Sequence, residues 1–262
     1  MLTYPHFDPI AFSVGPLSVH WYGLMYLLGF LAAWLLGRHR AKQPGSGWTV
    51  EMVDDMLTTC ILGVVLGGRL GYILFYDLAY YMENPAQVLQ VWNGGMSFHG
   101  GLVGVIACFW IFARKHGLSI FDIGDFASPL VPPGLFFGRL GNFINGELWG
   151  RHTTAEVGMI FPGGGPFPRH PSQLYEAALE GVVMFAMLWV YSGKRPPRRC
   201  VSGLFLILYG SFRFIVEFFR EPDAQLGFIA FNWLTMGMLL CLPMIALGMY
   251  LFHSGRRLNQ HL

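Results

Sequence analysis

Residues 52–76 of the chain read MVDDMLTTCILGVVLGGRLGYILFY. Beyond the two aspartates near its start, this stretch carries a single charged side chain, Arg69. A helix needs about 20 mostly apolar residues to cross the hydrocarbon core of a bilayer, and this stretch is long enough. Residues 52–76 therefore predict a membrane-spanning helix.

The rest of the chain contains six further apolar stretches, separated by charged or Gly/Pro-rich segments. They cover residues 17–37, 96–113, 120–138, 174–192, 201–219 and 233–253. Prolines 129, 132 and 133 interrupt the stretch 120–138, which is tolerated where neighbouring groups satisfy the freed carbonyls. The predicted fold class is an all-α polytopic membrane protein with seven transmembrane helices, built as a single integral membrane domain over residues 1–262.

The composition agrees with this prediction. Of the 262 residues, 54% are hydrophobic and only 12% are charged, whereas about 25% are charged in a soluble domain. The net charge of +2 gives no reason to expect nucleic acid as a partner. The four cysteines stand singly, and neither Cys nor His residues show a metal-ligand spacing, so we expect free thiols and no metal site.

The basic residues predict the orientation in the membrane. One side of the seven-span topology holds most of the Lys and Arg residues: Arg38, Arg40, Lys42, Arg114, Lys115, Lys194, Arg195, Arg198, Arg199, Arg256 and Arg257. The other side holds Arg139, Arg151, Arg169 and Arg220. By the positive-inside rule, the N-terminus is predicted to be outside and the C-terminus cytoplasmic. The longest connection, residues 140–173, then forms a small periplasmic head between helices four and five.

Polar side chains within the predicted spans gather at one depth. An ionisable side chain costs roughly 2.5 to 3.5 kcal/mol in a span, so each one needs a partner or a function. In the predicted topology, all of the following lie in the outer half of the membrane: His20, Tyr22, Arg69, Tyr72, His99, Arg139, Glu176, Glu180, Arg213 and Glu217. This clustering predicts a polar cavity that opens to the outer leaflet.

One helix face carries three of the candidates. Tyr209, Arg213 and Glu217 follow the spacing i, i+4, i+8, which stacks them on one side of a helix. They form either an intrahelical ion pair beside a tyrosine or a part of the site. Arginine favours the second interpretation because its rigid fork of donors suits phosphate and stays charged when buried.

Two glycine-rich segments hold the other candidates. Residues 138–147 read GRLGNFINGE, in which glycines allow close backbone approach and Asn142 adds neutral donors beside Arg139. The alternative is that the glycines serve only helix packing and that Glu147 neutralises Arg139 or Arg151. Two roles are also open for His99, which is either a general base or a hydrogen-bonded structural residue.

At these residues the sequence resembles a known family. The matching segments are HWYG (20–23), GGRLGY (67–72), GGMSFHGG (94–101), residues 138–150, RHPSQLYE (169–176), YGSFR (209–213) and EFFR (217–220). Over nearly the whole chain they are similar to bacterial prolipoprotein diacylglyceryl transferase. The resemblance implies a multi-pass enzyme of the bacterial inner membrane that needs no cofactor. Such an enzyme moves the sn-1,2-diacylglyceryl group from phosphatidylglycerol to the thiol of the lipobox cysteine of a preprolipoprotein. The implied reaction forms a thioether, releases glycerol 1-phosphate and is the first step of lipoprotein modification.

The resemblance and the depth of the polar residues together give an expected site towards the periplasmic leaflet. We expect Arg139 and Arg213 to bind the phosphate. We expect His99 to act as the base, unless the two arginines alone lower the pKa of the lipobox thiol enough. The expected substrate-binding residues are Arg139, Asn142, Tyr22, Tyr209, Glu217, Gly150 and Arg69. Within that set Asn142 places the head group, Glu217 orients Arg213, and the two tyrosines line the head-group site.

Two other classes of protein compete with this interpretation: a transporter or receptor, and a different membrane enzyme. A seven-helix transporter or receptor would have a cavity open to the outside, but the sequence has no internal repeat of the kind that transporters show. An intramembrane protease or an alcohol phosphatidyltransferase would need a Gly-x-Ser-Gly element, paired intramembrane aspartates or a multi-Asp metal motif. The sequence contains none of these.

Overall fold

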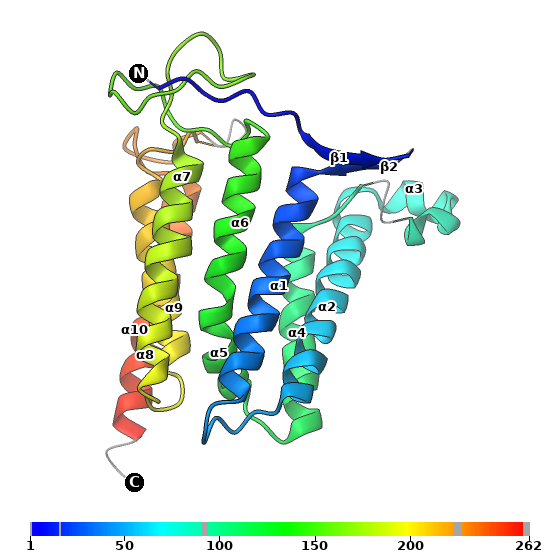
Figure 1. The fold of residues 1–262 in the computed structure, drawn as a ribbon, viewed down its shortest axis with the longest axis vertical. Helices are drawn as coiled ribbons and strands as arrows, with labels where there is room; N and C mark the ends of the chain where they lie inside the picture. Colours follow the sequence, from blue (N-terminus) through cyan, green and yellow to red (C-terminus); the bar gives the residue numbers. More distant parts are fainter. Residues whose placement is uncertain (1, 16, 91–93, 223–226, 259–262) are drawn as a thin grey trace. The chain divides into compact units, whose positions relative to one another are not determined.

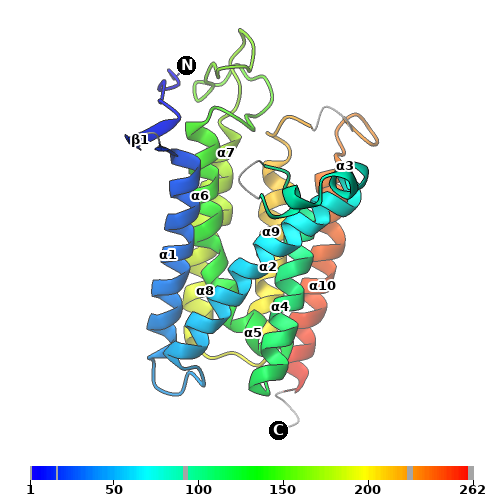
Figure 2. The same cartoon turned by 90° about the vertical axis from the view of Figure 1, so that its right-hand side faces the viewer.

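The computed structural model describes residues 2–15, 17–90, 94–222 and 227–258, most of which are helical. The chain divides into two compact units. One unit combines residues 1–35 with residues 124–262, and the other consists of residues 36–123. Both are built mainly from long helices (Figures 1 and 2).

The unit of residues 36–123 is a helix pair with a short arm. Helices α2 (Val50–Tyr76) and α4 (Phe98–His116) lie side by side, and the arm between them contains α3 (Leu78–Glu83) and η1 (Pro85–Leu89) (Figure 2). Thr49 caps α2 by accepting a hydrogen bond from the Met52 amide at 3.2 Å. Ser97 caps α4 in the same way through the Gly100 amide at 3.2 Å. Each cap satisfies an amide that a helix N-terminus leaves without a partner.

Glycines bring the backbones of α2 and α4 into direct contact. A Cβ atom added to Gly104 would meet the carbonyl oxygen of Gly63, and one added to Gly67 would meet the carbonyl oxygen of Gly100. Small residues at such positions let membrane helices approach closely and gain dispersion contacts. Gly67, Gly71 and Gly100 of the two motifs around Arg69 and His99 therefore serve helix packing.

The other unit contains a β-hairpin near its N-terminus, whereas the sequence predicts a helix from residue 17. Strands β1 (Ile10–Val14) and β2 (Leu17–His20) pair antiparallel, and α1 (Trp21–Ala41) begins only after them. The predicted start of the first span at residue 17 is therefore wrong, because residues 17–20 form a strand and α1 begins at Trp21, whereas the mostly helical fold class is confirmed. The physical reason is local, since a turn with Gly15 at φ +59° connects two short extended segments.

Prolines divide the helical segment of residues 120–144, as the sequence predicts. It consists of α5 (Ile120–Ala127), the 3-10 turn η3 (Ser128–Leu130) and α6 (Val131–Ile144). The 3-10 turn contains Pro129, and Pro132 and Pro133 open α6, where a missing amide hydrogen does least harm.

The remaining helices of this unit are long. The segment Ser172–Gly193 consists of α7 (Ser172–Glu176), the π-helical turn η4 (Ala177–Val183) and α8 (Met184–Gly193). Helices α9 (Cys200–Val216) and α10 (Met236–Leu258) lie side by side (Figure 1). Asp125 fixes the start of α9 because its Oδ1 accepts from the amide of Ser202 at 2.7 Å and its Oδ2 from the amide of Arg199 at 2.6 Å.

Irregular chain connects α6 to α7. Residues 145–171 lie over the ends of these two helices (Figure 1) and contain only isolated β-bridges, among them Met159 with Arg169. Their core is a buried cluster of Tyr4, Phe143, Met159 and Phe161. The Tyr4 hydroxyl donates to the carbonyl oxygens of Phe143 at 2.7 Å and Ile144 at 3.0 Å, which ties the N-terminal segment to the end of α6.

Several helices have the length and composition of membrane spans. Among the described residues, four segments meet both conditions: Val50–Tyr76, Phe98–His116, Ser172–Gly193 and Met236–Leu258. Leu62, Leu66, Leu70 and Leu74 recur every fourth residue of α2 and are each more than half exposed, which suits a lipid-facing stripe. The chain is thus a mostly helical, multi-pass membrane protein.

Candidate active site

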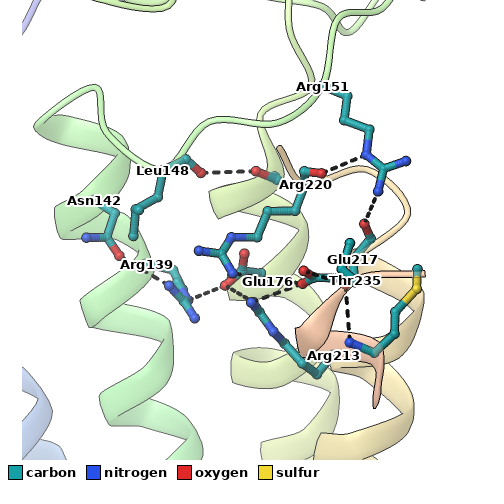
Figure 3. A network of polar contacts seen from close by, with 11 residues as sticks. Arg139, Asn142, Leu148, Arg151, Glu176, Arg213, Glu217, Arg220 and Thr235 are labelled. Carbon is teal, nitrogen blue, oxygen red and sulfur yellow. Dashed lines mark hydrogen bonds and ion pairs between the residues drawn. The ribbon is translucent and has the colours of Figure 1, made fainter. Parts of the chain in front are cut away.

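Two arginines from different helices converge on one buried carboxylate. Arg139 lies on α6, Arg213 on α9 and Glu176 at the end of α7, and their side chains point toward one another (Figure 3). The Oε2 atom of Glu176 is 2.5 Å from Nε of Arg139 and 3.2 Å from Nη1 of Arg213. The structure thus brings together the two residues that the sequence predicts to bind phosphate, and it adds the carboxylate that holds them.

A second carboxylate, that of Glu217 directly after α9, pairs with Arg213. The Oε2 atom of Glu217 is 3.1 Å from Nη2 of Arg213, which confirms the predicted i, i+4 ion pair. The Oε1 atom of Glu217 accepts a hydrogen bond from Thr235 at 3.0 Å, and Nη1 of Arg220 lies 3.9 Å from Oε2 (Figure 3). Glu217 therefore orients Arg213, as the sequence predicts.

The charges of this cluster differ in burial. The side chains of Glu176 and Glu217 are 1% and 5% exposed, whereas those of Arg213 and Arg139 are 13% and 20% exposed. The two carboxylates are thus more deeply buried than the two guanidinium groups. Each guanidinium has five N–H donors, and one or two ion-pair contacts leave donors free for an anion.

Asparagines continue the cluster along α6 toward the irregular segment. Nη1 of Arg139 lies 3.5 Å from Oδ1 of Asn142, and Nδ2 of Asn142 donates to Oε1 of Glu147 at 3.0 Å. Asn145 donates to the same oxygen at 3.3 Å. The amides of Asn142 and Asn145 therefore hold the side chain of Glu147, and in the part of the chain that the structure describes no ion pair joins Glu147 to Arg139 or Arg151.

A cavity of about 660 Å³ adjoins these residues. Its polar lining includes His20, Tyr22, Asn145 and Glu147. Its other lining residues are Tyr4, His6, Phe7, Pro9, Gly23, Ile144 and Pro162. The Tyr22 hydroxyl is 3.2 Å from that of Tyr26 and lies close to Glu147. Tyr22, which the sequence predicts to line the head-group site, therefore lines this cavity.

Tyr209 stands one helical turn before Arg213 on α9. Its ring stacks on Phe205 with 6.0 Å between the ring centroids, and it interacts electrostatically with Arg139 and Arg213. Tyr209 therefore belongs to the arginine cluster and does not line the cavity beside Tyr22.

Gly150 lies where two chain segments meet. A Cβ atom there would meet the carbonyl oxygen of Phe219 and would lie 2.8 Å from Cβ of His170. Next to it, Nε of Arg151 donates to the carbonyl oxygen of Arg220 at 2.8 Å (Figure 3). Gly150 thus permits the irregular segment to contact residues 217–220, which follow α9 and include Glu217.

Arg69 and His99 belong to the other unit. Arg69 is 4% exposed, and its guanidinium donates to carbonyl oxygens of the arm, including Gln87 at 2.6 Å, Val88 at 2.9 Å and Gly94 at 2.5 Å. Arg69 is therefore an anchor of the arm. His99 is exposed in the first turn of α4, with its ring centroid 5.6 Å from that of Phe98.

Three members of the cluster were not predicted as site residues. Glu176, Arg220 and Thr235 all contact it directly. The position of Glu176 in the outer half of a predicted span was a signal, because a buried acid needs a basic partner. The sequence has no such signal for Thr235, since threonine is common in apolar helices and in loops.

The described part of the chain contains no group of three or more His, Cys, Asp or Glu residues that could hold a metal ion. Its four cysteines, Cys60, Cys108, Cys200 and Cys241, are free thiols, as the sequence predicts. The acids of the cluster are instead paired with arginines. That pairing is suited to an anionic ligand.

Comparison with known proteins identifies the family. The family model described as prolipoprotein diacylglyceryl transferase matches residues 9–254. A phosphatidylglycerol–prolipoprotein diacylglyceryl transferase of Nitratidesulfovibrio vulgaris (strain DP4) is 67% identical over 255 residues, covering 97% of each chain. Proteins of the same name from Oleidesulfovibrio alaskensis and Coxiella burnetii are 66% and 59% identical, covering 96% and 95% of this chain and 94% and 95% of theirs. The chain belongs to the prolipoprotein diacylglyceryl transferase family.

Proposed function

We propose that this chain transfers the sn-1,2-diacylglyceryl group of phosphatidylglycerol to the thiol of the lipobox cysteine of a prolipoprotein, the first step of lipoprotein modification. The observation that supports the proposed site is the convergence of Arg139 and Arg213 on the buried carboxylate of Glu176. The names of relatives that are 59% to 67% identical over nearly the full chain support the substrates.

The arginine pair binds the phosphate of the lipid. A phosphodiester carries one negative charge, and a guanidinium offers it two parallel donors in a fixed geometry. Arg139 and Arg213 come from two helices, and both pair with Glu176. Their remaining N–H donors are therefore available to the same phosphate group. Asn142, in contact with Arg139, helps to place the head group.

The reaction is a displacement at carbon. The sulfur of the lipobox cysteine attacks the glycerol carbon that is joined to the phosphate oxygen, so an S–C bond forms and a C–O bond breaks. The electron pair of the broken bond stays on the phosphate, which leaves as glycerol 1-phosphate. Arg139 and Arg213 stabilise the charge that develops there, as preorganised donors do in other enzymes.

The thiol gives up its proton because the thiolate is the nucleophile. His99 is the proposed acceptor, since the ordinary pKa of a histidine lies near neutrality. The positive charge of the two arginines also favours the thiolate.

The cavity beside the arginine cluster receives the glycerol head group. Its polar residues Tyr22 and Glu147 face the space at the outer end of α6, and Asn142 links Glu147 to Arg139. The hydroxyl groups of the head group donate to the Glu147 carboxylate and the Tyr22 oxygen. Glu217 and Gly150 act indirectly by positioning Arg213 and the end of α9.

The proposed setting is the bacterial inner membrane. The chain crosses it seven times, with the N-terminus in the periplasm and the C-terminus in the cytoplasm, as the distribution of Lys and Arg supports. The irregular segment 145–171 is then a periplasmic head, and the site opens toward the periplasmic leaflet, where secreted precursors arrive. Arg69 anchors the arm in this arrangement.

The test uses purified full-length protein in vesicles that contain phosphatidylglycerol, mixed with a peptide that carries a lipobox cysteine. Mass spectrometry should find a diacylglyceryl-sized gain on the cysteine, together with free glycerol 1-phosphate. The controls are phosphatidylcholine vesicles and a peptide with serine in place of cysteine, and neither should give product. An unmodified cysteine peptide in phosphatidylglycerol vesicles would contradict the proposed function.

A further inference from the structure

Glu180 is a buried acid that the proposed reaction does not use. It is 0% exposed and lies one turn beyond Glu176, within the π-helical turn Ala177–Val183. Among the described residues, none donates a hydrogen bond to either of its carboxyl oxygens. π-Helical turns are frequent at functional sites, so an acid left without donors inside one calls for an explanation.

Charged and titratable groups from several helices lie near Glu180. Those that interact with it electrostatically are Arg139 on α6, Glu176 on α7, Tyr209 and Arg213 on α9, Arg220 after α9 and Cys241 on α10. Gly181 presses the same turn against α6, because a Cβ atom added to it would lie 2.6 Å from Cβ of Phe136. Glu180 is therefore enclosed within the arginine cluster.

The formal charges of this cluster cancel if every group is ionised. It contains the arginines 139, 213 and 220 and the acids Glu176, Glu180 and Glu217. Glu176 and Glu217 are held in ion pairs, but no such contact holds Glu180 within the described chain. An ionised carboxylate is strongly disfavoured where it is buried without donors. A neutral Glu180 leaves the cluster with one net positive charge, which balances one phosphodiester anion.

We propose that Glu180 is a positioning residue whose carboxyl group carries a proton in the working enzyme and thereby sets the charge of the arginine cluster for one phosphodiester. This inference rests on the proposed function, in which Arg139 and Arg213 bind the lipid phosphate. Glu180 does not touch the substrate but acts through these arginines. When Glu180 ionises, it competes with the phosphate for the same guanidinium groups.

The experiment compares two variants on neighbouring turns of one helical segment. Glu180→Gln keeps the shape of a neutral acid, whereas Glu176→Gln removes a charge that holds both arginines. For each full-length variant and the wild type, kcat and KM for phosphatidylglycerol are measured in vesicles over a pH series. Infrared spectra of the same samples report the carbonyl band of a protonated carboxylic acid.

Glu180→Gln should keep kcat and KM within about threefold of the wild type near neutral pH, since a neutral group replaces a neutral group. Its KM should stay flat as the pH rises, whereas the KM of the wild type increases when Glu180 loses its proton. Glu176→Gln should lose about a hundredfold in kcat/KM because it leaves buried arginines without their partner. The carboxylic-acid band should disappear in Glu180→Gln and persist in Glu176→Gln.

An acid band that is unchanged in Glu180→Gln would overturn the proposal, as would a loss of activity as large as that of Glu176→Gln. Glu180→Leu is a second neutral variant of similar volume, and failure of both neutral variants to fold would also contradict it. The infrared result separates this proposal from the proposed function. If the wild type forms no thioether, the assigned activity fails, whereas the band still reports the proton on Glu180.

Discussion

The Nε atom of Arg139 lies 2.5 Å from Oε2 of Glu176, and that same oxygen is 3.2 Å from Arg213. One buried acid thus sets the distance between two guanidinium groups that belong to different helices. Neither arginine can leave without breaking a buried ion pair, which typically costs several kcal/mol. The protein therefore holds both guanidinium groups in place by itself, as the proposed phosphate site requires.

Replacing Arg213 with lysine tests whether the geometry of the fork matters. Arg213→Lys keeps the positive charge, but an ammonium group cannot contact Glu176, Glu217 and a phosphate in the planar arrangement of a guanidinium. We expect kcat/KM to fall by about a hundredfold or more, a change of about 3 kcal/mol in transition-state stabilisation. Arg257→Lys, at an exposed position in the last turn of α10, is the matched control and should leave the rate unchanged.

A small effect of Arg213→Lys would mean that charge alone suffices. The specific fork contacts would then not explain catalysis.

Tyr4 gives a prediction about stability at high pH. Its hydroxyl donates to the carbonyls of Phe143 and Ile144, and burial raises its pKa above the usual value. Because the folded state holds the proton more tightly than the unfolded state, this contribution is complete below about pH 10 and is lost as the pH rises through the raised pKa. Thermal unfolding of the wild type should therefore shift to lower temperature above that pH.

Tyr4→Phe should be about 1 kcal/mol less stable than the wild type at neutral pH. As the pH rises further, the stability of Tyr4→Phe should decrease less than that of the wild type. Tyr80→Phe, on the arm, is the control variant. Identical alkaline shifts in wild type and Tyr4→Phe would contradict the role given to the Tyr4 hydroxyl.

Two glycines in α4 predict opposite outcomes for the same substitution. A Cβ atom at Gly104 would overlap the carbonyl oxygen of Gly63, whereas one at Gly101 would lie 3.6 Å from the nearest atom, the carbonyl oxygen of Val64. Gly104→Ala should destabilise the protein by about 1–3 kcal/mol through overpacking. Gly101→Ala should be neutral or stabilising by up to about 1 kcal/mol because alanine favours helix. Thermal melting in detergent measures both, and equal melting temperatures would refute the close packing of α2 and α4.

Arg69 predicts a local effect on the arm. Its guanidinium donates to carbonyls of Gln87, Val88 and Gly94 and lies 4.9 Å above the ring of Tyr81. Arg69→Gln should therefore speed hydrogen exchange and proteolysis in residues 77–90, with little change in the exchange of α9 and α10. Arg114→Gln, at the other end of the helix pair, is the control. Unchanged exchange of the arm in Arg69→Gln would show that these contacts do not hold it.

The sequence predicts those contacts that lie within one helix. The i, i+4 spacing of Arg213 and Glu217 predicts their ion pair, and the structure confirms it at 3.1 Å. The pair of Arg139 and Glu176 could not be predicted, because periodicity does not tell which faces of two distant helices meet. The same holds for Thr235 and Glu217, whose contact depends on how the chain packs after α9.

The fold shows a similar limit. The apolar stretches locate the long helices to within a few residues, and the prolines correctly predict the break before α6. The hairpin Ile10–His20 was missed because its second strand is apolar and runs directly into the first turn of α1. The glycine turn between its strands was the available signal.

The most direct test of the central claim is the binding of phosphatidylglycerol to Arg139→Ala, measured by native mass spectrometry and by thioether formation on the same sample. Arg257→Ala, on an exposed position of α10, is the control. We predict that Arg139→Ala folds and inserts normally but loses retained phosphatidylglycerol and forms thioether at least about a hundredfold more slowly, the effect expected when a preorganised donor is removed. An Arg139→Ala protein that retains the lipid and forms thioether at the rate of the wild type would contradict the account.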